Sequence, residues 1–403
     1  MLMLHTSDLH YGHVGRDTNR VPDQNRVLDE ILALCQARNV RLLLVAGDVF
    51  SNRLGSASPA SVARQLLARL APHLERGMAV FLLCGNHDNL PLFQLMRTFT
   101  AEMAGDAGSW PLVIADRPAV YDVPGLPHAV IALPYLTQPA LLNQSIALGL
   151  SQEEQVAILS GAISPRLQRL YDEAPPGRPT IFTTHFLVEG FTLDTDEGAT
   201  FESYHHDLRI SPQDLPHFTS YNALGHIHLQ QQITSAAKPT WYSGAPDRLD
   251  AGERAYKPGV LLVDLPDTPG GAATVEIVPT QASTPFVKEL LDGEEAVDQF
   301  CGAAASPLLL GEVTISGISA SRWAAVQARL RDAAPRVRLL WATARPAATP
   351  VAASWSDLND PLAIVRAHLD KQYQQQPEQR DRLLAALQQL LATEDISEAE
   401  VSA

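Results

Sequence analysis

Five short segments of the chain each end an apolar or β-branched run with side chains that can bind divalent metal ions. They are Asp8-x-His10, Gly47-Asp48, Gly85-Asn86-His87-Asp88, His185 and Gly225-His226-x-His228. A carboxylate can bridge two ions, an imidazole nitrogen binds one, and an amide carbonyl adds a neutral oxygen, so this mixture of ligands suits Mn, Fe or Zn. Together the segments predict a centre of two divalent cations that acts on a phosphoester.

The runs that precede these segments have the length and composition of buried strands. We expect strands at residues 1–6, 42–46, 79–84, 180–184 and 220–224, each bounded by turn residues. Every candidate ligand then follows the carboxyl end of a strand, which is the edge where sites form in open α/β sheets. Packing alone does not require metal-binding residues at so many strand ends.

Taken singly, some of these segments have simpler interpretations. Asp8-x-His10 could be a helix cap followed by a surface imidazole, and Gly47-Asp48 is a common turn. The turn after Gly85 is more specific because it crowds three polar side chains. The segment after Gly225 is also specific, since alternate residues leaving a strand point to the same side. The five segments together favour the metal centre.

Composition limits the class of protein. A chain of 403 residues favours two or three domains. It contains no run of 18 apolar residues, so we expect no membrane span, and because residues 1–6 resemble a strand that leads directly to Asp8 we expect no signal peptide. The three cysteines are odd in number and lack CxxC spacing, which suits core thiols in a reducing cytoplasm.

The net charge of the chain argues against a simple nucleic-acid-binding module. The formal net charge is −15 and the pI is near 5.3, which is not the basic footprint of such a module. A nuclease remains compatible with this charge, because its metals and a partner can supply positive charge. The chain has no P-loop motif, so any ATP dependence must come from another subunit.

The pattern of elements alternates between strands and helices in the first part of the chain. We expect helices at 24–37, 60–74 and 90–99, and a further helix from Ser151 toward Tyr171 that is interrupted at Pro165. Further strands are expected at 110–115, 119–123, 129–133, 230–234, 240–243, 259–264 and 274–278. Between residues 188 and 207 a solvated loop is favoured over a second metal site, the alternative raised by Asp194, Asp196, Glu197, Glu202, His205 and His206.

The domain prediction follows from these elements. Residues 1–284 form the phosphoesterase domain, and residues 285–346 form a small α/β cap with a strand at 308–315, a helix at 321–333 and a strand at 337–342. Residues 347–355 are a linker, residues 356–394 form two helices, and residues 395–403 are an acidic tail. The helices carry apolar stripes at Leu362, Val365 and Leu369, and at Leu383, Leu384, Leu387, Leu390 and Leu391. Such stripes can dock on the protein's own core, but after a linker we favour partner binding.

With His-Thr-Ser-Asp-Leu-His, Ala-Gly-Asp-Val-Phe, Gly-Asn-His-Asp, Thr-His-Phe and Ala-Leu-Gly-His-Ile-His in order, the chain resembles the calcineurin-like metallophosphoesterases. More narrowly, it resembles the SbcD-type nuclease subunits of bacterial SbcC-SbcD DNA repair complexes. The narrower resemblance rests on residues 220–228 and 241–246, on Lys257, and on Asp360-Pro361 before the last two helices. It implies an α/β fold, namely a four-layer αββα sandwich with a small α/β cap and C-terminal helices.

The resemblance also implies roles for individual residues. Asp48 would bridge two metals, most simply Mn, and the other ligands would be Asp8, His10 and His228 on one metal and Asn86, His185 and His226 on the other. This set leaves His87 without a metal, so we expect it to contact the scissile phosphate or the leaving oxygen, as an electrostatic stabiliser or a general acid, with Asp88 orienting it. His87 and Asp88 are therefore the candidate catalytic side chains. Members of this group act on DNA ends as exonuclease and endonuclease in double-strand-break repair, are gated by a coiled-coil ATPase that grips the C-terminal helices, and form homodimers. Two features depart from the pattern: Ser51 stands where many relatives carry Asp or His, and residues 194–206 have no evident match.

Two other functions remain open on the sequence. The same metal pair could serve a small-molecule phosphodiesterase or a phosphoprotein phosphatase. The chain could also be a nearly inactive scaffold that recruits an ATPase to DNA, although its complete ligand set argues against decay.

Overall fold

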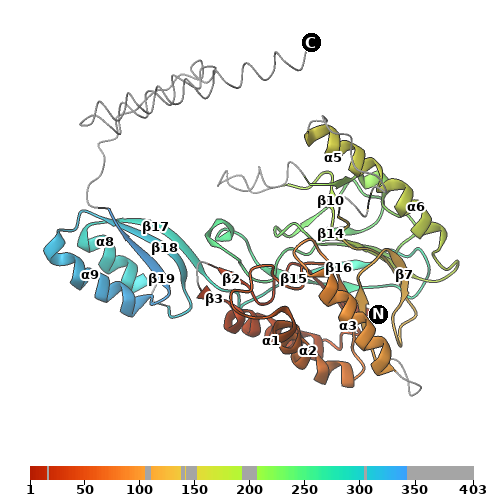
Figure 1. Ribbon diagram of the computed structural model, residues 1–403, viewed down its shortest axis with the longest axis horizontal. Coiled ribbons are helices and arrows are strands. Elements are labelled where there is room, and N and C mark those ends of the chain that lie inside the picture. Colours follow the sequence, from red (N-terminus) through yellow and green to blue (C-terminus); the bar gives the residue numbers. More distant parts are fainter. Residues whose placement is uncertain are drawn as a thin grey trace, which may run out of the picture. The chain divides into compact units, whose positions relative to one another are not determined.

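The computed structural model describes residues 1–15, 18–104, 110–137, 141, 152–192, 207–303 and 306–342 (Figure 1). The chain divides into two compact units, Met1–Thr343 and Ala344–Ala403. The second unit lies outside the described residues, as do the predicted linker, terminal helices and acidic tail. Ser151 and the residues at 194–206 lie outside them as well.

The first six-stranded sheet carries the amino-terminal motifs and has the order β16-β15-β1-β4-β5-β6. The strands β1, β4, β5 and β6 run parallel, while β15 and β16 extend the sheet antiparallel. Their bounds are β1 (Leu2–Thr6), β4 (Leu42–Val45), β5 (Ala79–Leu83), β6 (Leu112–Ala115), β15 (Gly259–Asp264) and β16 (Thr274–Pro279). Helices α1 (Val21–Ala37), α2 (Pro59–Glu75) and α3 (Leu90–Ala104) connect the parallel strands, which confirms the predicted alternation.

The second six-stranded sheet has the order β13-β14-β12-β9-β8-β7. Its four central strands run parallel, with antiparallel β7 and β13 at the edges. The bounds are β7 (Ala119–Asp122), β8 (Ala129–Leu133), β9 (Thr180–Thr184), β12 (Tyr221–Leu224), β13 (Gln231–Gln232) and β14 (Thr240–Tyr242). Because Thr184 pairs with Leu224 in register, the residues that follow these two strands lie side by side.

The two sheets pack face to face because alternate residues of each strand point to opposite sides. In β4, Leu42 and Leu44 lie in the core between the sheets, whereas Leu43 and Val45 pack with α1 and α2. The outer face of the second sheet packs against α5 (Gln152–Gly161) and α6 (Ser164–Asp172). The result is the predicted four-layer αββα sandwich, with the helical layers outermost (Figure 1).

The predicted break in the helix after Ser151 is also present. Helix α5 ends at Gly161 and α6 begins at Ser164, with Pro165 in its first turn. Proline is tolerated there because the first turn needs no backbone N–H donor. Short elements complete this region: β2 (Val14–Gly15), β3 (Thr18–Asn19), β10 (Leu187–Val188), β11 (Arg209–Ile210), and the 3₁₀ turns η1 (Pro212–Asp214) and η2 (Ala251–Glu253).

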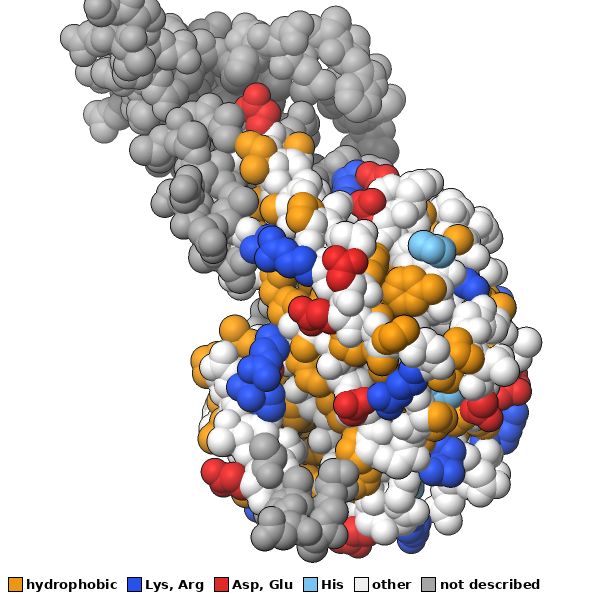
Figure 2. All heavy atoms as spheres, turned by 90° about the vertical axis from the view of Figure 1, so that its right-hand side faces the viewer, with side chains coloured by type: hydrophobic (Ala, Val, Ile, Leu, Met, Phe, Trp, Pro, Cys, Tyr) orange, Lys and Arg blue, Asp and Glu red, His pale blue; other side chains and the backbone are white. Residues whose placement is uncertain are grey.

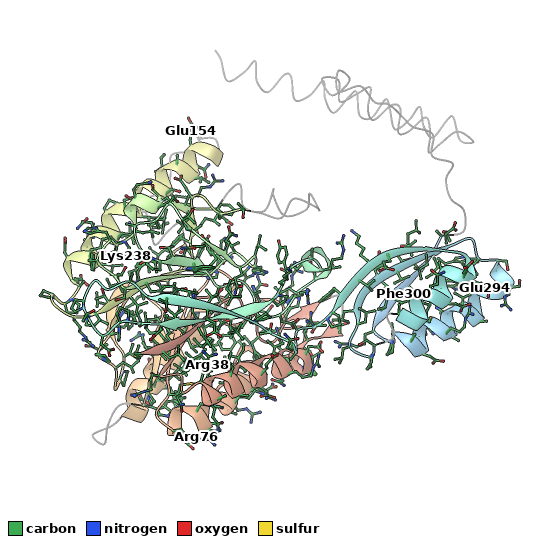
Figure 3. All side chains as sticks on the ribbon, turned by 180° about the vertical axis from the view of Figure 1, so that it is seen from behind. Arg38, Arg76, Glu154, Lys238, Glu294 and Phe300 are labelled. Carbon is green, nitrogen blue, oxygen red and sulfur yellow. The ribbon has the colours of Figure 1, made fainter. Side chains whose placement is uncertain are left out.

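A three-stranded parallel sheet, in the order β17-β18-β19, follows the sandwich along the chain. It consists of β17 (Phe286–Asp292), α8 (Gly293–Ala303), β18 (Leu310–Ser316), α9 (Ala320–Ala333) and β19 (Val337–Trp341). Phe300 of α8 packs toward the sheet in a separate apolar core, and Glu294 lies at the surface (Figure 3). The strand β17 and the helix α8 were not predicted. The domain limits at 284 and 346 stay predictions. Among the described helices, none is long and apolar enough to cross a membrane.

Candidate metal centre

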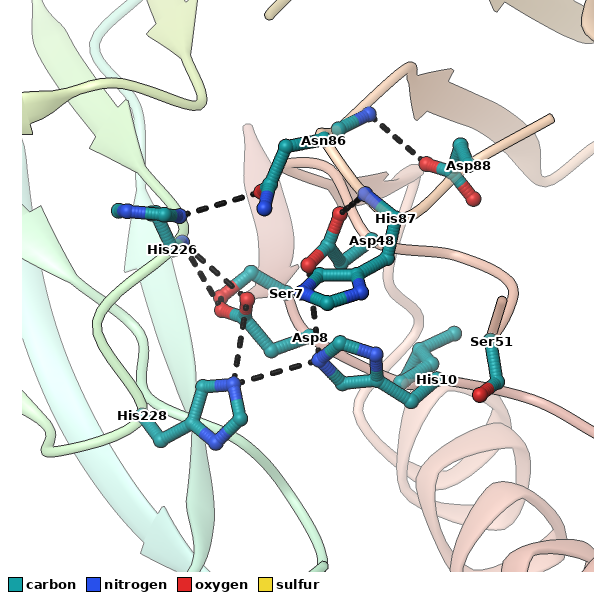
Figure 4. Close-up of polar contacts among 12 residues, drawn as sticks. Ser7, Asp8, His10, Asp48, Ser51, Asn86, His87, Asp88, His226 and His228 are labelled. Atoms are coloured by element: carbon teal, nitrogen blue, oxygen red, sulfur yellow. Dashed lines mark hydrogen bonds and ion pairs between the residues drawn. The ribbon is translucent and has the colours of Figure 1, made fainter. Parts of the chain in front are cut away.

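The structure brings all seven predicted ligands together where the parallel strands of both sheets end. Asp8, Asp48 and Asn86 follow β1, β4 and β5 of the first sheet, and His10 lies two residues beyond Asp8. His185, His226 and His228 follow β9 and β12 of the second sheet. Figure 4 labels all of these residues except His185 and shows the labelled side chains pointing toward a common centre. The site thus takes ligands from both halves of the sandwich.

One candidate cation position is lined by Asp8, His10, Asp48 and His228. The Nε2 atoms of His10 and His228 are 3.3 Å apart. His10 Nε2 is 3.5 Å from Asp48 Oδ2, and His228 Nε2 is 3.6 Å from Asp8 Oδ1. Metal–nitrogen bonds of about 2.1 Å place two ligand atoms of one ion roughly 3.0–3.4 Å apart. The nitrogen pair therefore has the separation of two ligands on a shared ion.

A second candidate position lies on the other side of Asp48. His185 Nε2 is 3.3 Å from Asp48 Oδ1 and 3.0 Å from Asn86 Oδ1, which in turn is 3.2 Å from His226 Nδ1. Asp48 thus directs Oδ2 to the first position and Oδ1 to the second. This is the arrangement that a bridging carboxylate requires.

The outer nitrogen of three imidazoles is held by a fixed acceptor. His185 Nδ1 donates to the carbonyl of Ala46 at 2.7 Å, His226 Nε2 donates to Asp207 at 3.0 Å, and His228 Nδ1 donates to Glu253 at 2.5 Å. An acceptor on one nitrogen fixes the tautomer, so that the other nitrogen presents its lone pair to the centre. His226 therefore presents Nδ1, whereas His185 and His228 present Nε2.

Some of the imidazoles at the centre are protonated, and a bound cation would displace these protons. Burial lowers the pKa of His185 and of His228, but this effect is outweighed: Asp48 raises the former to about 9, and Glu253 with Asp8 raises the latter to about 10. Burial lowers the pKa of His10 to about 3. In the metal-free protein the inner nitrogens of His185 and His228 thus carry protons that offset the negative charge around them, and divalent cations would displace these protons and take over that role.

Four of the candidate ligands have a left-handed backbone. The φ angles are 54° at Asp8, 42° at His10, 49° at Asp48 and 96° at His226. Among the described residues other than glycine, only Asn39 shares this region. A residue with a Cβ atom pays roughly 1–3 kcal/mol for such a conformation, and such strain concentrates at functional sites. The strain coincides here with the predicted ligands.

Two glycines of the motifs are required by close packing around these ligands. A Cβ atom on Gly85 would lie 2.1 Å from Asp48 Oδ1 and 2.3 Å from its backbone nitrogen. A Cβ atom on Gly225 would lie 1.9 Å from the carbonyl oxygen of Ala46. Neither position has room for a side chain, which explains why glycine precedes Asn86 and His226.

The family follows from comparison with known proteins. Residues 1–228 match the model of the calcineurin-like phosphoesterases, and this span ends on the last predicted ligand. The chain belongs to the calcineurin-like phosphoesterase family.

Several relatives of known name are SbcD subunits of the nuclease SbcCD. The SbcD protein of Bacillus subtilis is 28% identical over 299 residues, which is 72% of each chain. That of Escherichia coli K12 is 30% identical over 275 residues, which is 65% of this chain and 64% of the relative. A solved dimetal phosphatase from Danio rerio covers 70% of this chain and 99% of its own, at 11% identity and a TM-score of 0.33, and adds nothing to the assignment.

In this phosphoesterase the two candidate catalytic residues are placed differently. The His87 imidazole lies beside His10, with ring centroids 5.1 Å apart, and its backbone N–H donates to Asp48 Oδ1 at 2.9 Å. The Asp88 carboxylate accepts hydrogen bonds from the backbone N–H groups of Gly85, Val49 and Phe50 at 2.8, 3.2 and 2.7 Å. Burial and Asp48 raise the pKa of Asp88 to about 7. Asp88 therefore joins the two metal-binding turns and can act on His87 only through the backbone.

Sequence reasoning missed three residues that contact the ligands of this phosphoesterase, namely Asp207, Glu253 and Ser7, and a fourth, Ser243, that contacts Ser7. Asp207 and Glu253 hold His226 and His228, while Ser7 donates to Asp8 Oδ2 at 2.5 Å and contacts Ser243 at 2.7 Å. Ser7 adjoins a ligand and Ser243 lies in the Trp-Tyr-Ser-Gly-Ala-Pro segment, so both had a signal in the sequence. Asp207 and Glu253 had none, because only the fold brings them to the imidazoles.

Ser51, which stands where many relatives carry Asp or His, contacts a histidine in the structure. Ser51 Oγ is 3.1 Å from Nδ1 of the buried His13 and accepts a hydrogen bond from the backbone of Arg53 at 3.0 Å. The serine thus organises the loop after Phe50 and places an imidazole beside it.

Proposed function

We propose that this phosphoesterase is a nuclease that hydrolyses phosphodiester bonds at DNA ends with two Mn ions. We propose further that it works in the cytoplasm as the nuclease subunit of an SbcC-SbcD-like complex in double-strand-break repair. The observation that carries the proposal is the orientation of the Asp48 carboxylate. Its two oxygens face two separate groups of candidate ligands. The names of the relatives, which are nuclease subunits, support a nucleic acid as the substrate.

The side chains of the site have distinct tasks in this proposal. When bound, two divalent cations supply the positive charge that polarises a phosphodiester and lowers the pKa of an attacking water. Asp48 would fix the spacing of the two cations. The imidazoles and Asn86 would be their other ligands, together with Asp8. His87 stands at the edge of the first position, beside His10, where it can donate a hydrogen bond to the phosphate or a proton to the leaving oxygen.

The overall charge supports a role for partners or metals in holding DNA. Lys and Arg side chains are interspersed with Asp and Glu over the face shown in Figure 2, and the net charge is −15. Such a face gives little long-range attraction for a polyanion. The proposed ATPase partner, bound through residues 356–394, would supply that attraction.

The function is tested by comparing three substrates under the same conditions. We expect full-length protein with Mn to cleave linear duplex DNA, and we expect this activity to vanish with EDTA and in Asp48→Ala. Preference for bis(4-nitrophenyl) phosphate or a phosphopeptide, with intact DNA, would favour a small-molecule phosphodiesterase or a protein phosphatase instead. No turnover of any substrate would favour the scaffold.

The proposed homodimer has a candidate surface on α3. This helix exposes Leu90, Leu95 and Phe99 by 40, 63 and 50%, and Leu95 and Phe99 are four residues apart, so they share a face. Burial of such a face between two copies would stabilise a dimer. We expect Leu95→Glu to give a monomer by light scattering, whereas Ile277→Glu, at a similarly exposed position of β16, should leave the mass unchanged. A dimer in both variants would exclude this face.

A further inference from the structure

The imidazole of His228 is held from behind by Glu253. Its Nδ1 atom is 2.5 Å from Glu253 Oε1, and the second carboxylate oxygen accepts the backbone N–H of Leu249 at 2.8 Å. The side chains of His228 and Glu253 are only 16 and 12% exposed. Since both carboxylate oxygens are engaged, the carboxylate cannot rotate away from the ring without losing a hydrogen bond.

The contact determines which nitrogen His228 presents to the centre. An ionised carboxylate only accepts hydrogen bonds, so Nδ1 must carry the proton. In the neutral ring that binds a metal, the lone pair of Nε2 then faces His10 Nε2 and Asp8 Oδ1, at 3.3 and 3.6 Å. His226, two residues earlier, presents the opposite nitrogen because Asp207 holds its Nε2. Neighbouring imidazoles on one strand end thus need separate supports to adopt opposite orientations.

We propose that Glu253 is a positioning residue for the first cation, fixing the tautomer and orientation of His228. This inference rests on the proposed function, because it assumes that His228 binds a metal. A carboxylate on the outer nitrogen of a ligating imidazole also raises the basicity of the inner nitrogen. Glu253 therefore contributes to metal affinity without touching the metal.

The position of Glu253 depends on elements far from the ligands. It ends the 3₁₀ turn η2, which Asp250 caps by accepting the N–H of Gly252 at 2.7 Å. The segment before the turn is held by the buried Arg20, which donates to the carbonyls of Leu249 and Arg248 at 3.2 and 3.1 Å. The turn also contacts β17 and β18. The support of His228 thus draws on the start of α1 and on the C-terminal sheet.

The test measures Mn binding to full-length protein by isothermal titration calorimetry. We expect wild type to bind two ions, and we expect Glu253→Ala to bind one of them about 10- to 100-fold more weakly, with the other unchanged. Glu253→Gln should recover part of the loss, because its amide oxygen can still accept from Nδ1. A matched control is Glu30→Ala, since Glu30 also accepts two backbone N–H groups, from Gln281 and Ala282, but has no hydrogen bond to an imidazole among the described residues.

The outcomes separate positioning from general stability and from the proposed function. Both sites with wild-type affinity in Glu253→Ala would overturn the positioning role alone. Equal weakening of both sites, with a melting temperature of the metal-free protein below that of Glu30→Ala, would also overturn it in favour of a structural role. A wild-type protein that binds no Mn would overturn the proposed function and the inference together.

Discussion

Asp48 is the residue on which both candidate cation positions depend, because each of its oxygens faces a different group of ligands. We expect Asp48→Ala to lose both metals and all turnover, whereas removal of a ligand that faces only one cation position should weaken binding at that position alone. Calorimetry with Mn measures the stoichiometry. Asp267→Ala, at a surface position 73% exposed, serves as the control. Two Mn ions still bound to Asp48→Ala would refute the bridging role.

His87 separates catalysis from metal binding. Its backbone N–H donates to Asp48, and one of its ring nitrogens lies within 4.8 Å of ligand atoms of His10 and Asp48. In the proposed set of seven ligands, however, its ring belongs to neither cation position. We expect His87→Ala to keep two Mn ions and to cleave DNA about 10²- to 10⁴-fold more slowly, as for loss of a general acid. Single-turnover rates at saturating Mn measure the effect. Near-normal cleavage would remove His87 from the mechanism.

At the scale of elements, the turns after β4 and β5 fit together only because residue 85 has no side chain. We expect Gly85→Ala to lower the free energy of unfolding by about 1–3 kcal/mol, since a Cβ atom would overlap Asp48. The same variant should bind Mn more weakly. Urea unfolding of the metal-free protein measures the first effect, and calorimetry the second.

The matched control for that substitution is Gly302→Ala. Gly302 lies in α8, and a Cβ atom there would have no neighbour within 4 Å. Alanine should stabilise that helix by at most about 1 kcal/mol, because residue 302 lies in its last turn. If Gly85→Ala were as stable as Gly302→Ala, the close approach of the two turns would not be a constraint.

Elements that bury a continuous or periodic apolar face were predictable from the sequence. The central strands β4 and β5, for example, are unbroken apolar runs between turn residues, and their ligands could be placed at once. Strand β17 was missed because Lys288 and Glu289 interrupt its apolar residues, and only Val287 and Leu291 are buried. Glu253 was missed for a different reason: its partner His228 is distant in sequence, and no spacing rule connects a 3₁₀ turn to an imidazole.

At the scale of the whole molecule, a buried ionic cluster links α1 to the segment that follows β14 and to the C-terminal sheet. Arg20 contacts Asp23 and Asp247 at 3.0 and 2.8 Å, and its guanidinium lies over the Phe286 ring. Arg336, which precedes β19, contacts Asp23 at 2.5 Å. Burial raises the pKa of Asp23, but the hydrogen bond from Arg336 and the charge of Arg20 hold it below the ordinary range.

We expect Asp23→Asn to lower the free energy of unfolding by about 3 kcal/mol at pH 7, because it leaves buried Arg20 undercompensated. Since the pKa of Asp23 is lowered in the folded protein, its contribution is full above pH ~4 and is lost as the pH falls further. Urea unfolding at pH 7 and pH 3 checks the direction. Asp29→Asn, which breaks an exposed pair with Arg69, should lower the free energy of unfolding by less than about 1 kcal/mol. If the two substitutions lowered it equally, the buried cluster would contribute no more to stability than a surface pair.

The seven candidate ligands are shared between two sheets that otherwise adhere through the apolar side chains of their common core. Bound ions would therefore act as cross-links between the halves of the sandwich, as disulfides do in secreted domains. By mass action, the free energy of unfolding rises with the concentration of the ions. Survival of the chain against proteases would then follow the metal supply of the cell, so that starvation for metal removes the protein as well as its activity.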